Sequence, residues 1–271
     1  MRGLLIYDRI GAKRNEWFID RLIACASQRG CELSLIIYED GFNNTLDVKP
    51  DFAIVRTIHP ELNRMLEDIG VPSFNNYVTS RIANDKWKTC LLASELGISV
   101  MDTLPLSSVD DPELLPYPIV IKSTNGHGGS EVFLANNPED CKQAVTLLAQ
   151  KSAIVQRMCD EPGVDMRVYV LGGKILRAVK RTSQVDFRSN FSLGGKVDLA
   201  APTKEMEEAI SRLQSVLKSD LVGVDFIRHA GRWVLNEIED VVGTRMLYSL
   251  TDIDIADKYI EYIINKINSL A

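Results

Sequence analysis

Two apolar runs separated by a short polar segment stand out in the last third of the sequence. The runs cover residues 221–227 and 233–238, and the polar segment 229–232 between them contains a glycine. Apolar runs joined by such a segment are typical of a β-hairpin. The hairpin constrains the fold strongly, because the position of the turn sets which residues of the two strands face each other.

Three carboxylates fall on this predicted hairpin. A turn in the middle of 229–232 places Asp225 opposite Asn236 or Glu237. Glu237 and Glu239 are two residues apart, so they share one face of their strand. Facing carboxylates destabilise a sheet unless a cation neutralises them, and oxygen ligands favour Mg²⁺. The spacing alone is equally compatible with a solvated hairpin edge that carries scattered acids.

Composition limits the classes of protein to consider. The chain has 271 residues, 45% of them hydrophobic and 25% charged, as expected for a globular protein with two or three subdomains. A net charge of −6 argues against nucleic acid as the main partner. Five cysteines without CxxC spacing indicate reduced thiols and no zinc site. We see neither a signal peptide nor an apolar run of about eighteen residues, so we expect a cytoplasmic protein without a membrane partner.

The first 75 residues alternate between two kinds of pattern. Short apolar runs predict strands, and runs with helical spacing predict helices; the strands are expected at 3–7, 33–38 and 52–55, and the helices at 16–28 and 60–69. This alternation predicts a small, mostly parallel α/β domain. The GxGxxG fingerprint is absent, so dinucleotide binding is not indicated.

A lysine and a glycine-rich loop mark the middle of the chain. One long helix is expected over 79–96, carrying Lys86. A strand over 119–122 ends in Lys122 and is followed by the loop STNGHGGS and a second strand over 131–134. Glycines allow backbone N–H groups to approach phosphate oxygens, so we interpret this hairpin as a nucleotide lid. A plain flexible loop is the alternative.

Further elements complete the pattern. A helix over 138–150 is expected to bury Val145, Leu147 and Leu148, and a strand follows at 153–156. Strands over 165–171 and 174–181 are joined by Gly172-Gly173, a hairpin signature. Helices are expected over 204–218 and 255–270.

Basic residues gather at one end of this second hairpin. Asp165 and Arg167 share a face of the first strand, and the second strand ends in Lys180-Arg181. Basic side chains at strand ends suit anionic oxygens. For Lys180 or Arg181 taken singly, a solvated hairpin end is the interpretation we favour.

Several motifs occur in the order known from one enzyme family. They are Asn84-Asp85-Lys86, Ile119 to Lys122 with its glycine-rich loop, Val155-Gln156-Arg157-Met158, Gly163-Val164-Asp165-Met166-Arg167, Asp186-Phe187-Arg188-Ser189-Asn190 followed by Gly194-Gly195, Gly223-Val224-Asp225 and Glu237-Ile238-Glu239. From about Asn75 to its C-terminal end the chain resembles the RimK-type ATP-grasp carboxylate–amine ligases.

The resemblance implies a fold and a reaction. The fold would be the α/β (α+β) ATP-grasp fold, with an N-terminal pre-ATP-grasp domain over 1–75, a central subdomain with the lid over 76–160 and a C-terminal subdomain with the magnesium site over 161–271. The two α+β subdomains would clamp ATP. The reaction would phosphorylate a carboxylate with ATP, and an amine would then attack the acyl phosphate to form an amide or peptide bond. ATP and Mg²⁺ or Mn²⁺ would be required, the substrate would be an amino acid or a peptide, and members are commonly homo-oligomers.

The resemblance also assigns roles to residues. It implies nucleotide contacts for Lys86, Lys122, Gly126, Gly128, Gly129, Ser130, Gln156, Arg157, Met158, Asp165, Arg188, Ser189 and Asn190. Arg188 and Asn190 would also be catalytic, holding the transferred phosphoryl group. Asp225, Glu237 and Glu239 would bind the metal. Arg167 is a candidate for a substrate contact. Arg245 is a second candidate, which no family motif supports.

The chain departs from the family pattern at three places. Glu239 stands where the family usually has asparagine, Arg157 stands where it has an acidic residue, and Val242-Gly243 replaces Pro-Gly. Two other functions are compatible with the same motifs. One is a regulatory module that binds ATP without ligase turnover, and the other is a phosphotransferase that stops at a phosphorylated product.

Overall fold

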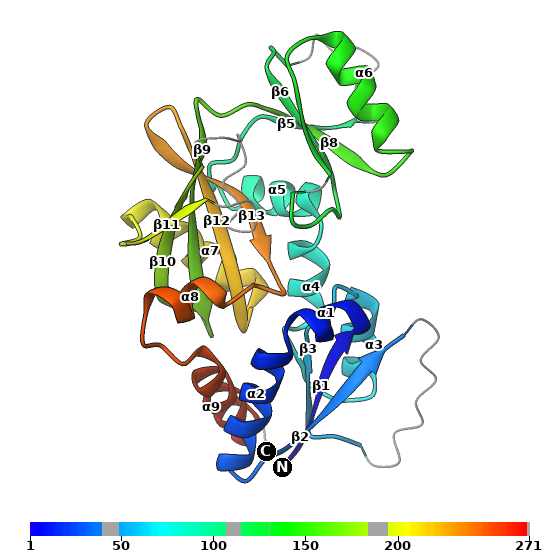
Figure 1. Ribbon diagram of the computed structural model, residues 1–271, viewed down its shortest axis with the longest axis vertical. Coiled ribbons are helices and arrows are strands. Elements are labelled where there is room, and N and C mark those ends of the chain that lie inside the picture. Colours follow the sequence, from blue (N-terminus) through cyan, green and yellow to red (C-terminus); the bar gives the residue numbers. More distant parts are fainter. Residues whose placement is uncertain (40–48, 107–114, 130, 184–194, 270–271) are drawn as a thin grey trace.

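Three β-sheets stacked along the long axis organise the computed structural model of the chain (Figure 1). The structure describes residues 1–39, 49–106, 115–129, 131–183 and 195–269. The first sheet is parallel, with the strand order β2-β1-β3-β4. Its strands are β1 (Arg2–Asp8), β2 (Glu32–Tyr38), β3 (Phe52–Val55) and β4 (Ser73–Phe74). Helices α1 (Arg9–Arg14), α2 (Glu16–Gln28) and α3 (Pro60–Asp68) accompany it. The α/β character predicted for this part of the chain is confirmed.

The second sheet is antiparallel, and the glycine-rich loop connects two of its strands. Its strand order is β5-β8-β6-β7, formed by β5 (Thr103–Pro105), β6 (Ile119–Ser123), β7 (Val132–Ala135) and β8 (Ala153–Arg157). Helix α6 (Pro138–Leu147) packs against it through Cys141 and Ala144. Our expectation that Val145 and Leu147 point inward is wrong, because these two side chains are 40% and 68% exposed. The helix turns its small residues toward the sheet instead.

The third sheet is the largest and contains both predicted hairpins. Its strand order is β11-β10-β9-β12-β13, formed by β9 (Glu161–Leu171), β10 (Lys174–Thr182), β11 (Lys196–Ala200), β12 (Leu221–His229) and β13 (Arg232–Glu239). Helix α7 (Lys204–Leu217) buries Met206, Ile210 and Leu213 in the core beside it. The remaining helices are α4 (Tyr77–Ala83), α5 (Lys86–Glu95), α8 (Arg245–Leu250) and α9 (Ile255–Asn268).

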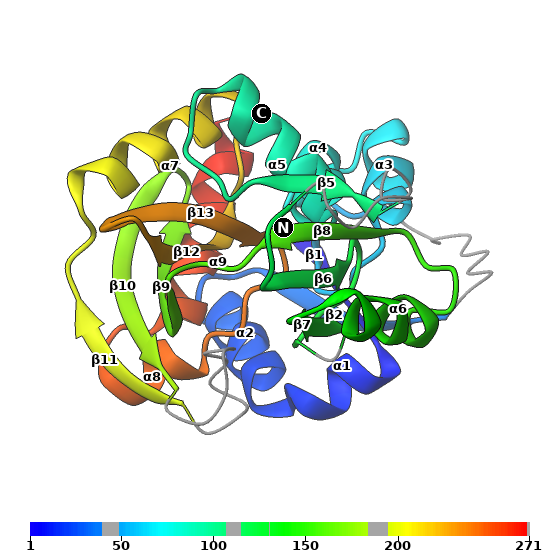
Figure 2. The same cartoon turned by 90° about the horizontal axis from the view of Figure 1, so that it is seen from above.

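The C-terminal helix returns to the beginning of the chain. Helix α9 lies beside α2, and Tyr259, Ile260 and Ile263 share a hydrophobic core with Leu22 and Cys25 (Figure 1). The five-stranded sheet and the four-stranded sheet formed by β5 to β8 lie on either side of α5 when the molecule is viewed from above (Figure 2). None of the helices in the described ranges combines the length and the apolar character that crossing a membrane requires.

The prediction of one long helix over 79–96 is wrong. The structure has two helices there, α4 and α5, with a break at Asn84-Asp85. The Asp85 side chain caps α5 by accepting the backbone N–H groups of Trp87 and Lys88. Aspartate at an N-cap satisfies donors that the first helical turn leaves unpaired. The break therefore makes Lys86 the first residue of a new helix.

Candidate active site

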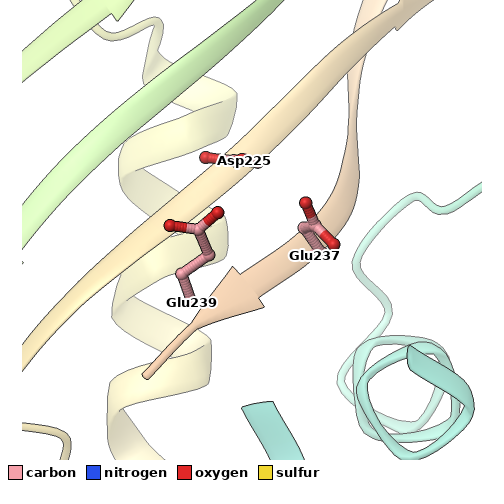
Figure 3. A group of neighbouring side chains, drawn as sticks. All are labelled: Asp225, Glu237 and Glu239. Carbon is pink, nitrogen blue, oxygen red and sulfur yellow. The ribbon is translucent and has the colours of Figure 1, made fainter. Parts of the chain in front are cut away.

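The hairpin β12–β13 has, at the carboxylates, one of the two registers that its turn allows. Asp225 faces Glu237 and Gly223 faces Glu239, with an irregularity just after Asp225. Oxygen atoms of the three carboxylates lie within 4.8 Å of one another. Figure 3 shows the carboxyl groups of Glu237 and Glu239 on β13 close to that of Asp225 on β12. The acidic patch inferred from spacing therefore exists.

Two buried arginines neutralise much of this patch. Arg167 on β9 donates from Nε to Asp225 Oδ1 at 2.8 Å and from Nη2 to Asp225 Oδ2 at 2.6 Å and to Glu239 Oε1 at 2.5 Å. Arg181 on β10 donates to Asp225 Oδ2 at 2.7 Å and, through two nitrogens, to Asp165 at 2.5 and 2.7 Å. The solvated hairpin end that we favoured for Arg181 is thus wrong, because its side chain is 4% exposed.

The strand order explains this arrangement. Strand β9 lies between β10 and β12, so Arg181 pairs with Asp165 across one ladder and Arg167 pairs with Asp225 across the other. The Gly172-Gly173 turn alone would place Lys180 opposite Asp165, but a register shift between Ile175 and Arg177 brings Arg181 there instead, so the turn could not have identified this pair. Nothing in the sequence indicated that β9 pairs with β12.

The arginines also control the ionisation of the acids. Burial opposes the charge on Asp225, but Arg167 and Arg181 outweigh it and lower its pKa to about 2. For Glu239, burial raises the pKa, and the charges of Asp225 and Glu237 add to this effect while Arg167 opposes it. The pKa values of the two carboxylates that share Arg167 are therefore shifted in opposite directions, down for Asp225 and up for Glu239.

Two lysines approach the acids from the other side. Lys86 Nζ donates to the carbonyl oxygen of Gly126 at 2.5 Å and lies 3.7 Å from Glu237 Oε2. Lys122 Nζ donates to Gln156 Oε1 at 2.7 Å and to Asn236 Oδ1 at 3.0 Å. Burial lowers the pKa of Lys122 to about 8, with the charge of Lys86 contributing in the same direction and Glu237 opposing it. Asn236 is a contact that sequence reasoning did not assign.

A cavity of about 310 Å³ joins these groups. Among the predicted site residues, those that line it are Lys86, Lys122, Gly126, Gly128, Gly129, Gln156, Arg157, Met158, Asp165, Arg167, Glu237, Glu239 and Arg245. Asp225 belongs to the carboxylate cluster, with its side chain buried. Ser130, Arg188, Ser189 and Asn190 lie outside the described residues.

Two backbone N–H groups in the cavity lining, those of Arg157 and Met158, already have partners within the protein. The N–H of Arg157 donates to the carbonyl oxygen of Asp102 at 3.0 Å, and the N–H of Met158 donates to that of Pro118 at 3.1 Å. A ligand bound beside Arg157 and Met158 would therefore contact atoms of these residues other than the two N–H groups. Cys159 also lines the cavity here, and no sequence signal had singled it out.

The cavity also reaches the N-terminal helices. Asn15, at the junction of α1 and α2, lines it together with Thr244, Arg245 and Met246. Arg245 Nη2 donates to the carbonyl oxygen of Arg14 at 2.8 Å, which ties α8 to α1. Asn15 carries no motif, so only the tertiary structure places it here.

The donor set of the acidic cluster fits a hard divalent cation. All three groups are carboxylates, and Mg²⁺ prefers oxygen ligands with substrate phosphates completing its shell. Arg167 and Arg181 hold Asp225 and Glu239 without occupying Glu237, which keeps a 28% exposed side chain. Glu237 is therefore the carboxylate of this cluster that neither arginine holds, and the side chain of Glu239 is similarly exposed, at 32%.

Comparison with known proteins agrees with this geometry. Residues 83–263 match the RimK-like ATP-grasp domain. A probable alpha-L-glutamate ligase of Methanococcoides burtonii is 27% identical over 270 residues, which cover 90% of each chain. An uncharacterized protein of Mycoplasma genitalium is 30% identical over 272 residues, covering 98% of this chain and 93% of the relative.

Solved structures show the same fold. The D-alanine–D-alanine ligase of Bacillus anthracis, solved with ATP, superposes with a TM-score of 0.75 at 17% identity, covering 100% of this chain and 98% of that one. The fold is therefore the ATP-grasp fold. The chain belongs to the RimK-like ATP-grasp family. It is an ATP-grasp ligase that forms C–N bonds, and the family generally uses ATP with a divalent metal ion.

Proposed function

We propose that this ligase activates a carboxylate as an acyl phosphate and joins it to the amine of an amino acid or a peptide. The observation that carries the proposal is the single cavity in which the two lysines, the glycine-rich loop and the carboxylate hairpin converge. These groups come from helix α5 and from two separate sheets, and each suits a different part of a metal-bound nucleotide. The proposal concerns the reaction steps and the roles of the residues.

The nucleotide would lie between the four-stranded sheet formed by β5 to β8 and the five-stranded sheet. Lys86 and Lys122 would contact its phosphates, and the backbone of the glycine-rich loop would approach them closely. Gly128 and Gly129 have φ of 68° and 77°, a conformation that other residues rarely adopt. Gln156, Arg157 and Met158 would contact the base, with Asp165 nearby on the floor of the cavity.

Asp225, Glu237 and Glu239 would hold one or two divalent ions. Such an ion neutralises phosphate charge while the phosphoryl group is transferred. Arg167 pairs with both Asp225 and Glu239, so its positive charge reduces the repulsion between these carboxylates without a metal ion. The extra charge that Glu239 carries, relative to the asparagine usual in the family, is thereby compensated within the protein.

The chemistry would proceed in two steps. A substrate carboxylate oxygen attacks the γ-phosphorus of ATP, forming the acyl phosphate and releasing ADP. The amine then attacks the carbonyl carbon, phosphate leaves, and the ammonium proton is lost to solvent. Arg188 and Asn190, predicted from the sequence, would hold the transferred phosphoryl group, while Arg167 and Arg245 would orient the substrate. No side chain is needed as a covalent nucleophile.

An amino acid is the first amine to test. Relatives covering most of the chain are named probable alpha-L-glutamate ligases. The cavity end beside Asn15 and Arg245 would receive a carboxylate-bearing substrate, since the exposed guanidinium can pair with a carboxylate. We therefore propose L-glutamate or a glutamyl peptide as the first substrates to supply.

The decisive experiment measures ADP and phosphate release with Mg-ATP across pairs of amino acids, glutamyl peptides and small carboxylates. A ligase releases both only when acid and amine are present together, and mass spectrometry detects the amide. ATP binding without turnover across the panel would support a regulatory module instead. ADP release with a phosphorylated product and no amide would support a phosphotransferase.

A further inference from the structure

A buried amide fastens one end of the carboxylate hairpin. Asn75 follows β4 and is 3% exposed. Its Oδ1 accepts the backbone N–H groups of Asp220 and Leu221 at 2.6 and 3.0 Å, and its Nδ2 donates to the carbonyl oxygen of Leu221 at 2.8 Å. Because Leu221 is the first residue of β12, this side chain fixes where the hairpin begins.

A buried carboxylate fastens the other end. Asp240 comes directly after β13 and is 3% exposed. Its Oδ1 accepts from Asn75 Nδ2 at 2.7 Å, and its Oδ2 accepts from Asn84 Nδ2 at 3.1 Å. Among the described residues no lysine or arginine forms an ion pair with it. Ser80 is a third side-chain hydrogen-bond partner. An acid suits this position because an ionised carboxylate presents only acceptors to the two amide donors.

The second partner of Asp240 leads directly to the nucleotide end of the cavity. Asn84 is the C-cap of α4 and comes two residues before Lys86, the first residue of α5. Asp240 itself comes directly after Glu239. The bridge Asn75–Asp240–Asn84 therefore connects the hairpin that bears the carboxylates with the helix start that bears Lys86, at the point where Lys86 Nζ lies 3.7 Å from Glu237.

We propose that the Asn75–Asp240–Asn84 bridge positions Lys86 against the carboxylate hairpin, so that nucleotide phosphates and the metal ion are bound as one unit. The bridge residues are absent from the lining of the cavity in the described part of the chain, so they act through Lys86 and Glu237. The inference rests on the proposed nucleotide and metal roles of these two residues. It gives these three buried polar residues a role in positioning a nucleotide-binding lysine, in addition to their hydrogen bonds within the core.

The test measures the affinity for ATP by calorimetry, with and without Mg²⁺, in the full chain. The ratio of the two dissociation constants reports how strongly metal and nucleotide are coupled. In Asn84→Ala we expect this ratio to fall about tenfold, because Lys86 loses its fixed place beside Glu237. Asp240→Asn should act in the same direction, since its amide group turns a donor toward Asn75 or Asn84. If Asp240→Asn does not fold, Asn84→Ala alone decides.

Asn76→Ala is the matched control. Asn76 is also an amide that anchors α4, but it bonds to the carbonyl oxygens of Leu217 and Lys218, and neither of these residues is among those that line the cavity. The control should lose stability and keep the coupling ratio. In addition, Asn84→Ala should have no further effect on the ratio in a Lys86→Ala background, because the bridge acts through Lys86.

The outcomes separate this proposal from the one on which it rests. A folded Asn84→Ala variant with wild-type coupling overturns the bridge alone, as does an equal loss of coupling in Asn76→Ala. A wild-type chain that binds ATP no better with Mg²⁺ than without it overturns the assigned nucleotide and metal roles, and the bridge with them.

Discussion

Replacing Arg181 by methionine should destabilise the protein strongly, although the residue stands at the end of a hairpin. Arg181 forms three hydrogen bonds, two with Asp165 and one with Asp225, and its side chain is 4% exposed. Hydrogen bonds to charged groups contribute roughly 1.5–3 kcal/mol each. Removing the arginine also removes its own burial cost, and Asp225 keeps Arg167, so the net loss is below this sum. Breaking a buried ion pair from one side costs about 3–5 kcal/mol, which is the value we expect here.

The assay is urea unfolding followed by circular dichroism at pH 7. Lys180→Met, an exposed neighbour on the same strand, should change the free energy of unfolding by less than about 0.5 kcal/mol. Adding Asp165→Asn to Arg181→Met should recover part of the loss, because one stranded charge is removed. A loss below about 1 kcal/mol in Arg181→Met would refute the reasoning, since buried acids would then tolerate the missing cation.

The same variant has a predicted pH dependence. The arginines lower the pKa of Asp225 to about 2, so its ionised form stabilises the native chain above the unfolded value of about 3.9. This contribution disappears as the pH falls through about 2. Without Arg181 the pKa of Asp225 is less depressed, so the difference in stability between variant and wild type should shrink as the pH falls from about 4 to about 2.

Three further predictions follow from individual contacts. Because the pKa of Lys122 is about 8, the affinity for ATP, measured by calorimetry, should weaken up to about tenfold per pH unit above that value. Lys122→Arg should remove this pH dependence, and an unchanged wild-type affinity between pH 7 and 9 would contradict the prediction. Glu237→Gln should abolish turnover and raise the Mg²⁺ concentration needed for nucleotide binding about tenfold or more, while the melting temperature stays near that of the wild type. An unchanged metal dependence would mean that Glu237 is not a metal ligand. A Cβ on Gly223 would lie 2.7 Å from Val242 Cγ2, so Gly223→Ala should cost about 1–3 kcal/mol in urea unfolding, and a neutral effect would mean that the loop after β13 moves away.

Local patterns predicted most of the elements well. Helix α2 and strand β3 have the bounds that apolar spacing predicts, and both hairpins form where glycine-containing turns indicate them. The break between α4 and α5 was missed, because apolar spacing continues through Asn84-Asp85 and hides the N-cap. The exposed Leu147 was misassigned because α6 packs through smaller residues.

The candidate site divides in the same way. The carboxylate cluster could be read from the sequence, because the turn limits which residues of the hairpin face each other. The turn left Asn236 and Glu237 as alternatives opposite Asp225, and only the irregularity after Asp225 decided for Glu237. The partnership of Arg167 with Asp225 could not, because it requires β9 to lie beside β12, about fifty residues further along the chain. The bridge through Asp240 likewise joins segments that are far apart in sequence.

The sequence by itself thus determined the hairpins, the acidic cluster and the positions of the lysines, because short-range periodicity and turn chemistry act between neighbours. Only the tertiary structure decided which cations balance those acids and what holds Lys86 beside Glu237. These contacts depend on the order of strands in the sheet and on the burial of faces from distant segments. Asp225, first inferred to need a metal ion for its charge, is balanced in the fold by Arg167 and Arg181.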